Sequence, residues 1–322
     1  MSQISSTYKL LGGADLIGTG FVNSALYGIS FVLYCFSARL LYQQLEDPYQ
    51  RRRSLITLIH ASIVIACGFC ALALDAWRYK ISYVDHGDYP GGGYRYQSIA
   101  QGLPMGIASS SLLFAAMDCF TQGIQIWRLW VVWNMSRYAT LMVLLPSLAL
   151  LGFIGLEIAI ATFDFHPELV HTDFALTLIP AANALSFFIT ISVAIAIIGR
   201  IAMIRRQHIK IMGDSDNSRQ YTTIITMLIE SFALDSIWLT VAIIFTALNH
   251  RRSPALFAGR QFITGTLSYI RLVSYLLVIY RVSANRGWEK DTERHLTSIQ
   301  WNHGTQKTTE TAVEEPVTMS TV

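Results

Sequence analysis

Residues 138–161 read YATLMVLLPSLALLGFIGLEIAIA, an apolar run whose only charged residue is Glu157. A hydrocarbon core about 30 Å thick is crossed by roughly 20 residues of apolar α-helix, which rises about 1.5 Å per residue. This run is therefore long enough to cross a membrane. The composition agrees, because 52% of the 322 residues are hydrophobic and 14% are charged, against about 25% charged in soluble domains.

Six further runs meet the same requirement, so the sequence predicts an all-α membrane protein built as a seven-transmembrane helix bundle. The predicted spans are Leu16–Tyr42, Leu55–Trp77, Met105–Trp133, Tyr138–Ala161, Ala175–Ile204, Thr222–Leu248 and Phe257–Tyr280. This transmembrane domain covers residues 16–281 and follows a short external tail, residues 1–15. Residues 282–301 mix charged side chains with Trp288 and Trp301, a pattern typical of an amphipathic helix at a membrane surface. Residues 302–322, rich in threonine and glutamate, are expected to form a disordered cytoplasmic tail.

The distribution of lysine and arginine predicts the orientation, because cytoplasmic segments carry an excess of both. With the amino terminus outside, most of these residues fall in or beside cytoplasmic segments. They are Arg51, Arg52, Arg53, Arg137, Arg200, Arg205, Arg206, Lys210, Arg219, Arg281, Arg286, Lys290 and Arg294. The opposite side receives far fewer. We therefore expect the amino terminus outside and the carboxyl terminus in the cytoplasm.

Several function classes lack the residues that they need. A net charge of +3 provides no basic surface for nucleic acid. The seventh span has no lysine for a retinal Schiff base, and His60 is the only histidine inside a span, too few for a zinc hydrolase. No nucleophile is accompanied by a base. The chain is thus expected to have no catalytic residue, metal or cofactor, and not to be an enzyme.

Four charged residues lie well away from the ends of the predicted spans, where an unpaired charge is costly. They are Asp118 in the third span, Glu230 and Asp235 in the sixth, and Arg271 in the seventh. Glu230 and Arg271 each lie about 9 residues, near 14 Å, from the cytoplasmic ends of their spans, which predicts that they pair. Asp118 also lies near mid-bilayer and could join them. Asp235 is about 140° around the helix from Glu230, so the two cannot face one partner.

This polar cluster has two interpretations, which the sequence leaves open. It could be a switch, or the floor of a ligand cavity, whose rearrangement moves the sixth helix. It could instead be a fixed ion-paired network that only locks the helices together.

Tryptophan and arginine mark the inner end of the third span, where residues 125–133 read QIWRLWVVW. Trp127 and Trp130 are three residues apart and flank Arg128. Arg128 is either a conformational latch or, with the two indole rings, an interfacial anchor whose guanidinium reaches the phosphates or stacks on indole.

Three motifs occur in order along the chain: WRLWVVW at residues 127–133, IES at 229–231 and YRVSANRGW at 280–288. With them the chain resembles a large family of uncharacterised seven-transmembrane integral membrane proteins from mushroom-forming (basidiomycete) fungi, over roughly Gly18 to Trp288. The resemblance implies a membrane location and a seven-helix architecture, but no ligand or activity. It also implies an aromatic residue at position 235, which puts a role for Asp235 in doubt.

The functional hypothesis is a receptor-like seven-helix sensor in the plasma membrane or an internal membrane. A small-molecule ligand would lie between the third, sixth and seventh helices, and a cytosolic partner would meet the third cytoplasmic loop, Arg205–Arg219. The surrounding partner is the lipid bilayer. Two alternatives stay open: a transporter or channel for a small solute, and a non-signalling structural or lipid-interacting membrane protein.

Overall fold

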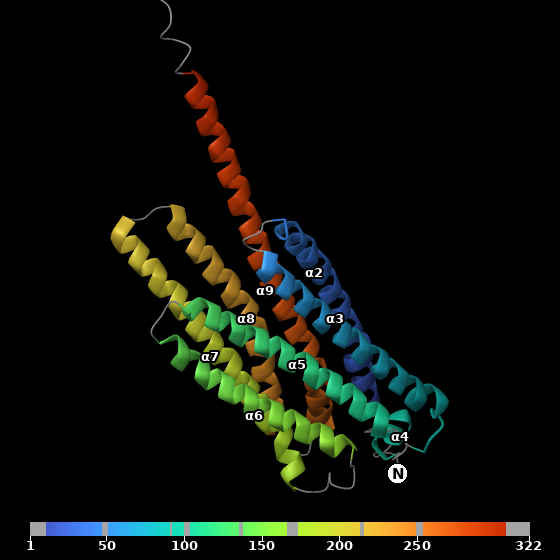
Figure 1. The fold of residues 1–322 in the computed structure, drawn as a ribbon. Helices are drawn as coiled ribbons and strands as arrows, with labels where there is room; N and C mark the ends of the chain where they lie inside the picture. The colour runs from blue at the N-terminus through green and yellow to red at the C-terminus, as the bar shows by residue number, and fades with distance from the viewer. Residues whose placement is uncertain are drawn as a thin grey trace, which may run out of the picture.

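The protein is helical throughout the part of the chain that its computed structural model describes. Those residues are 11–46, 51–90, 92–99, 104–134, 138–165, 173–212, 216–248 and 254–306. They form helices and turns, with no strand among them. Figure 1 shows the long helices side by side in one elongated bundle. The predicted all-α class is confirmed.

Each predicted span coincides with one long helix. The first is a π-helical segment, η1 (Leu16–Val22), continued by α2 (Asn23–Gln44). The second is α3 (Arg51–Tyr79), which runs into another π-helical segment, η2 (Lys80–Asp85), and is followed by the short α4 (Gly93–Ile99). The others are α5 (Pro104–Trp133), α6 (Ala139–Phe165), α7 (Asp173–Met212), α8 (Asp216–Leu248) and α9 (Pro254–Gln306).

Five helical stretches among the described residues are long and apolar enough to cross a membrane. They are Leu11–Gln44, Arg51–Asp85, Ala139–Phe165, Thr177–Met203 and Ala258–Ala284. The sixth predicted span contributes a shorter apolar stretch, Phe232–Ala247. The third predicted span, α5, falls outside the set, and its middle carries Asp118, Gln122 and Gln125, which lower its hydropathy. These helices are those of a membrane-embedded, multi-pass protein.

The bundle carries large apolar side chains on its outer surface and polar ones inside. Phe21, Leu151 and Ile195 are mostly exposed, whereas Asn23 and Gln122 are completely buried. Exposed apolar surface on this scale is stable only when lipid surrounds it, because water would favour its burial. Buried polar groups hold helices together in lipid, where packing and hydrogen bonds replace the hydrophobic effect between helices.

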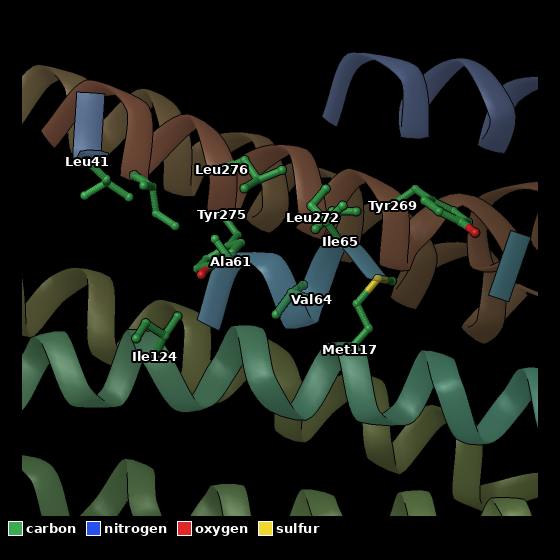
Figure 2. Close-up of a cluster of buried hydrophobic side chains, with 11 residues drawn as sticks. Leu41, Ala61, Val64, Ile65, Met117, Ile124, Tyr269, Leu272, Tyr275 and Leu276 are labelled. Atoms are coloured by element: carbon green, nitrogen blue, oxygen red, sulfur yellow. The ribbon is translucent and has the colours of Figure 1, made fainter. Parts of the chain in front are cut away.

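Two clusters of buried apolar side chains form the core. The first cluster, shown in Figure 2, joins α2, α3, α5 and α9 through Leu41, Ala61, Val64, Ile65, Met117, Ile124, Tyr269, Leu272, Tyr275, Leu276 and Ile279. The second cluster joins α5, α6, α7 and α8 through Ile126, Leu129, Trp133, Phe153, Ala182, Ile189, Val193, Ala194, Ile197 and Phe232. α5 contributes to both, and so lies between them.

Polar contacts fix α9 to its neighbours on the side of the first cluster. Asn23 Nδ2 on α2 donates to the Gly265 carbonyl at 3.0 Å. Tyr269 Oη donates to the Gly68 carbonyl of α3 at 3.2 Å. These bonds set the height of α9 against α2 and α3, and therefore the depth at which its charged residues lie.

The segment between α3 and α4 folds back over the end of the bundle through two glycines. Gly92 adopts a φ of 82°, which side-chain-bearing residues rarely adopt. A Cβ at Gly93 would lie 2.4 Å from the carbonyl oxygen of Ser82, so the backbone approaches too closely for any side chain. Tyr83 Oη then donates to the Gly12 carbonyl at 3.3 Å. A tyrosine- and glycine-rich stretch is thus ordered by specific backbone contacts.

The carboxyl-terminal helix α9 runs without a break to Gln306 and projects beyond the other helices, as the red ribbon in Figure 1 shows. It includes residues 282–301, predicted to lie at a membrane surface, and that placement stays a prediction. Residues 307–322 of the predicted tail and residues 1–10 of the external tail lie outside the described residues. So do most side chains of the loop Arg205–Arg219.

Candidate functional site

Arg271 is the centre of a buried ionic network, in the middle of the apolar stretch Ala258–Ala284 of α9. Its side chain is 2% exposed. Its Nη1 lies 2.7 Å from Oδ2 of Asp118 on α5, and its Nε lies 3.6 Å from Oδ1 of Asp235 on α8. Its Nη2 donates to Oγ of Ser186 on α7 at 2.9 Å. One side chain therefore links α9 to three other helices.

Hydroxyl and amide groups complete the network. Ser268 Oγ donates to Asp118 Oδ2 at 3.1 Å, Thr190 Oγ1 to Asp235 Oδ2 at 3.4 Å, and Gln122 Nε2 to Ser186 Oγ at 2.7 Å. Sequence reasoning missed these four residues, because serine and threonine in helices often bond only to their own backbone. The available signal was spacing: Ser268 is three residues from Arg271 and Gln122 four from Asp118, so each pair shares a helix face.

The network contains more acceptor capacity than it uses. It combines two carboxylates with one guanidinium, so its formal charge is negative when both acids are ionised. Within the described residues, Oδ1 of Asp118, Oδ1 of Asp235 and Oε1 of Gln122 are buried without a hydrogen bond. An unsatisfied buried acceptor costs about 1–3 kcal/mol. These oxygens are available to a proton or to the donor group of a ligand.

No family model, curated protein or solved structure matches this chain. The network is therefore interpreted from its own chemistry. Its groups are carboxylate, guanidinium, hydroxyl and amide, which can bind, exchange partners and exchange protons. The likeness to the fungal seven-helix family stays a prediction.

The predicted pairing of Glu230 with Arg271 is wrong. Glu230 forms an ion pair with Arg281 instead, and its side chain is 61% exposed. Arg281 is ten residues beyond Arg271, about 15 Å further along α9. The structure thus brings Asp118, Asp235 and Arg271 together and leaves Glu230 outside the network.

The error has two physical causes. The prediction counted the depths of Glu230 and Arg271 from the ends of their predicted spans. The helices extend past those ends, because α8 begins at Asp216 and α9 continues to Gln306, so the two span ends do not mark the same depth. Depth also says nothing about which side of a helix a residue occupies. Asp235, five residues after Glu230, is on the buried side of α8, and it is the carboxylate that meets Arg271.

Arg128 and its flanking tryptophans divide between two environments. Trp127 and Arg128 are half-buried and line a cavity, and Trp127 also packs against the first cluster. Trp130 is exposed on the outer surface, as expected of an interfacial anchor. Arg200 makes a cation–π contact at this end of the bundle, where its guanidinium carbon lies 5.4 Å from the Trp133 ring centroid.

Proposed function

We propose that this chain is a receptor-like seven-helix membrane sensor whose switch is the network of Asp118, Asp235 and Arg271. The observation that carries the proposal is that Arg271 contacts three other helices through polar groups in the middle of the bundle. The proposal includes seven spans, with the amino terminus outside and the carboxyl terminus in the cytoplasm. The resemblance to fungal seven-helix proteins supports that architecture.

The position of the network between the two apolar clusters favours a switch. Arg271 belongs to α9, which packs in the first cluster, while Ser186 and Asp235 come from α7 and α8, which pack in the second. Close-packed clusters move as bodies and resist continuous deformation. The polar contacts between them can exchange partners, since Arg271 has two carboxylates within reach. A change of partner would then shift α7 and α8 relative to α9.

The unsatisfied acceptors indicate where a ligand would act. Asp118 on α5, Asp235 on α8 and Arg271 on α9 belong to the three helices between which the ligand is expected. A ligand that donates hydrogen bonds to the Oδ1 atoms of Asp118 and Asp235, which accept none from any described residue, would stabilise one arrangement of the network over the other. The cytosolic partner would bind the loop between α7 and α8, and its affinity would depend on the resulting movement.

Distance measurements between spin labels test the switch. Phe36 on α2 and Ile195 on α7 are exposed, and labels there would report the separation of the two clusters. With the native cysteines replaced, we expect two distance populations whose ratio changes in Asp235→Asn, because that change leaves Arg271 with one charged partner. A single distance that is the same with and without Asp235→Asn would mean that the network is a fixed ion-paired lock and not a switch. Solute flux through reconstituted vesicles would instead support a transporter.

The topology has its own test, a reporter fused to each end of the chain. The excess of arginine beside the predicted cytoplasmic segments requires a reporter after Val322 to be cytoplasmic and one before Met1 to be external. Protease protection in sealed cells or vesicles measures both. Two reporters on the same side would exclude an odd number of spans and with it the seven-helix architecture.

A further inference from the structure

A cavity of about 230 Å³ lies at the end of the bundle where α3 begins and α5 ends. Its wall is largely aliphatic and aromatic, with three hydroxyl groups and two arginines. The lining residues are Leu41, Arg53, Ser54, Thr57, Trp127, Arg128, Val131, Val132, Ile197, Ile201, Phe232, Val278, Ile279, Val282 and Ser283. Among the described residues of the wall, the charged side chains are the two arginines.

The two arginines come from different helices. Arg53 is at the exposed start of α3 and makes no ion pair with any described residue, whereas Arg128 is half-buried near the end of α5. Both guanidinium groups line the same cavity. Guanidinium groups bind phosphate and carboxylate through short, charge-assisted hydrogen bonds. The charge of the cavity therefore favours an anion.

The wall on one side of the cavity is held in place. Gln44 Nε2, at the end of α2, donates to the Ser283 carbonyl of α9 at 3.1 Å. Ser54 Oγ on α3 donates to Gln44 Oε1 at 3.2 Å. Gln44 thereby ties together α2, α3 and α9 through Ser54 and Ser283, two residues of the cavity wall. The rest of the wall, from Val131 to Phe232, is aliphatic or aromatic and suits a hydrocarbon chain.

We propose that this cavity binds an anionic amphiphile, a molecule with a phosphate or carboxylate head on an apolar chain. The head lies between Arg53 and Arg128, and the chain contacts Val131, Ile197 and Val282. The volume is somewhat below the roughly 300–1,000 Å³ of pockets for drug-sized ligands. It therefore holds the head and the first part of one chain. This assignment rests on the cavity alone and does not depend on the sensor proposal.

The test is equilibrium binding of a radiolabelled single-chain alkyl phosphate to the full chain in phosphatidylcholine nanodiscs. We expect saturable binding at one site. Dodecanol and inorganic phosphate should each compete at least about tenfold more weakly than the unlabelled alkyl phosphate, because dodecanol lacks the anionic head and phosphate lacks the apolar chain. Arg53→Gln and Arg128→Gln should each weaken binding by about tenfold, because each change removes a charge-assisted hydrogen bond to the head. Arg52→Gln, one residue from Arg53 and outside the cavity wall, is the matched control and should bind normally.

A variant that fills the cavity distinguishes binding inside it from nonspecific attraction of anions to the arginine-rich end of the bundle. Val131→Phe keeps both arginines but occupies the space, so it should abolish saturable binding. Unchanged binding in Val131→Phe, or equal losses in Arg52→Gln and Arg53→Gln, would overturn the proposal. Equally tight binding of inorganic phosphate would overturn the amphiphile and leave an anion site. If Arg128→Gln does not fold, Arg53→Gln at the exposed rim still decides the outcome.

Discussion

Replacing Arg271 with alanine is expected to lower the free energy of unfolding by about 3–5 kcal/mol, the usual cost of removing one partner from a buried ion pair. The change leaves Asp118 and Asp235 buried without the guanidinium that lies 2.7 Å and 3.6 Å from them. It also removes the hydrogen bond to Ser186. Reversible unfolding in mixed micelles, with a denaturing detergent as the titrant, measures the loss.

Arg281→Ala is the matched control, because it removes another ion-paired arginine of the same helix. Arg281 pairs with the largely exposed Glu230, and exposed pairs contribute about 0–1 kcal/mol. We therefore expect little change in stability. Similar losses for Arg271→Ala and Arg281→Ala would mean that the buried network does not hold the helices together.

A double-mutant cycle shows whether Asp118 and Arg271 interact directly. Combining Arg271→Gln with Asp118→Asn should recover part of the loss, because amides can bond across a helix interface and Asp235 alone remains charged. Additive losses would mean that the two residues do not interact.

Leu272→Ala is expected to lower the free energy of unfolding by about 2 kcal/mol. Leu272 follows Arg271 in the chain, is 0% exposed and belongs to the first cluster, where Figure 2 shows it. In soluble proteins, Leu→Ala in a core costs about 2–5 kcal/mol, part of which is the lost transfer from water. Lipid is itself apolar, so here mainly the packing part remains. The same micelle titration measures the effect.

Leu151→Ala provides the comparison on the outer surface. Leu151 is 65% exposed on α6, where its neighbours are expected to be lipid chains. Its truncation opens no cavity and should change the stability by less than about 0.5 kcal/mol, as is usual away from packed sites. A large loss at Leu151 would indicate that this surface is covered by protein instead of lipid.

Hydropathy was sufficient to locate the helices because lipid leaves the backbone few alternatives. Inside a bilayer every backbone donor and acceptor must be satisfied within the chain, so a long apolar run becomes a helix. For this reason Tyr138–Ala161 coincides with α6 to within a few residues. The same reasoning identified Arg271, Asp118 and Asp235 as buried charges that need partners, but it could not assign the partners.

The sequence by itself determined the helical class, the membrane surroundings and the presence of charge inside the bundle, since each depends on composition summed along one helix. Only the tertiary structure decided that Arg271 contacts Asp235 and that Glu230 contacts Arg281. It also decided that Ser186 and Gln122 enter the network and that Arg53 and Arg128 line one cavity. Those contacts depend on how each helix is rotated about its axis and how far it slides past its neighbours. Both are set by close packing of side chains from different helices, such as those of α5 and α9 that meet in the first cluster, which no single helix encodes.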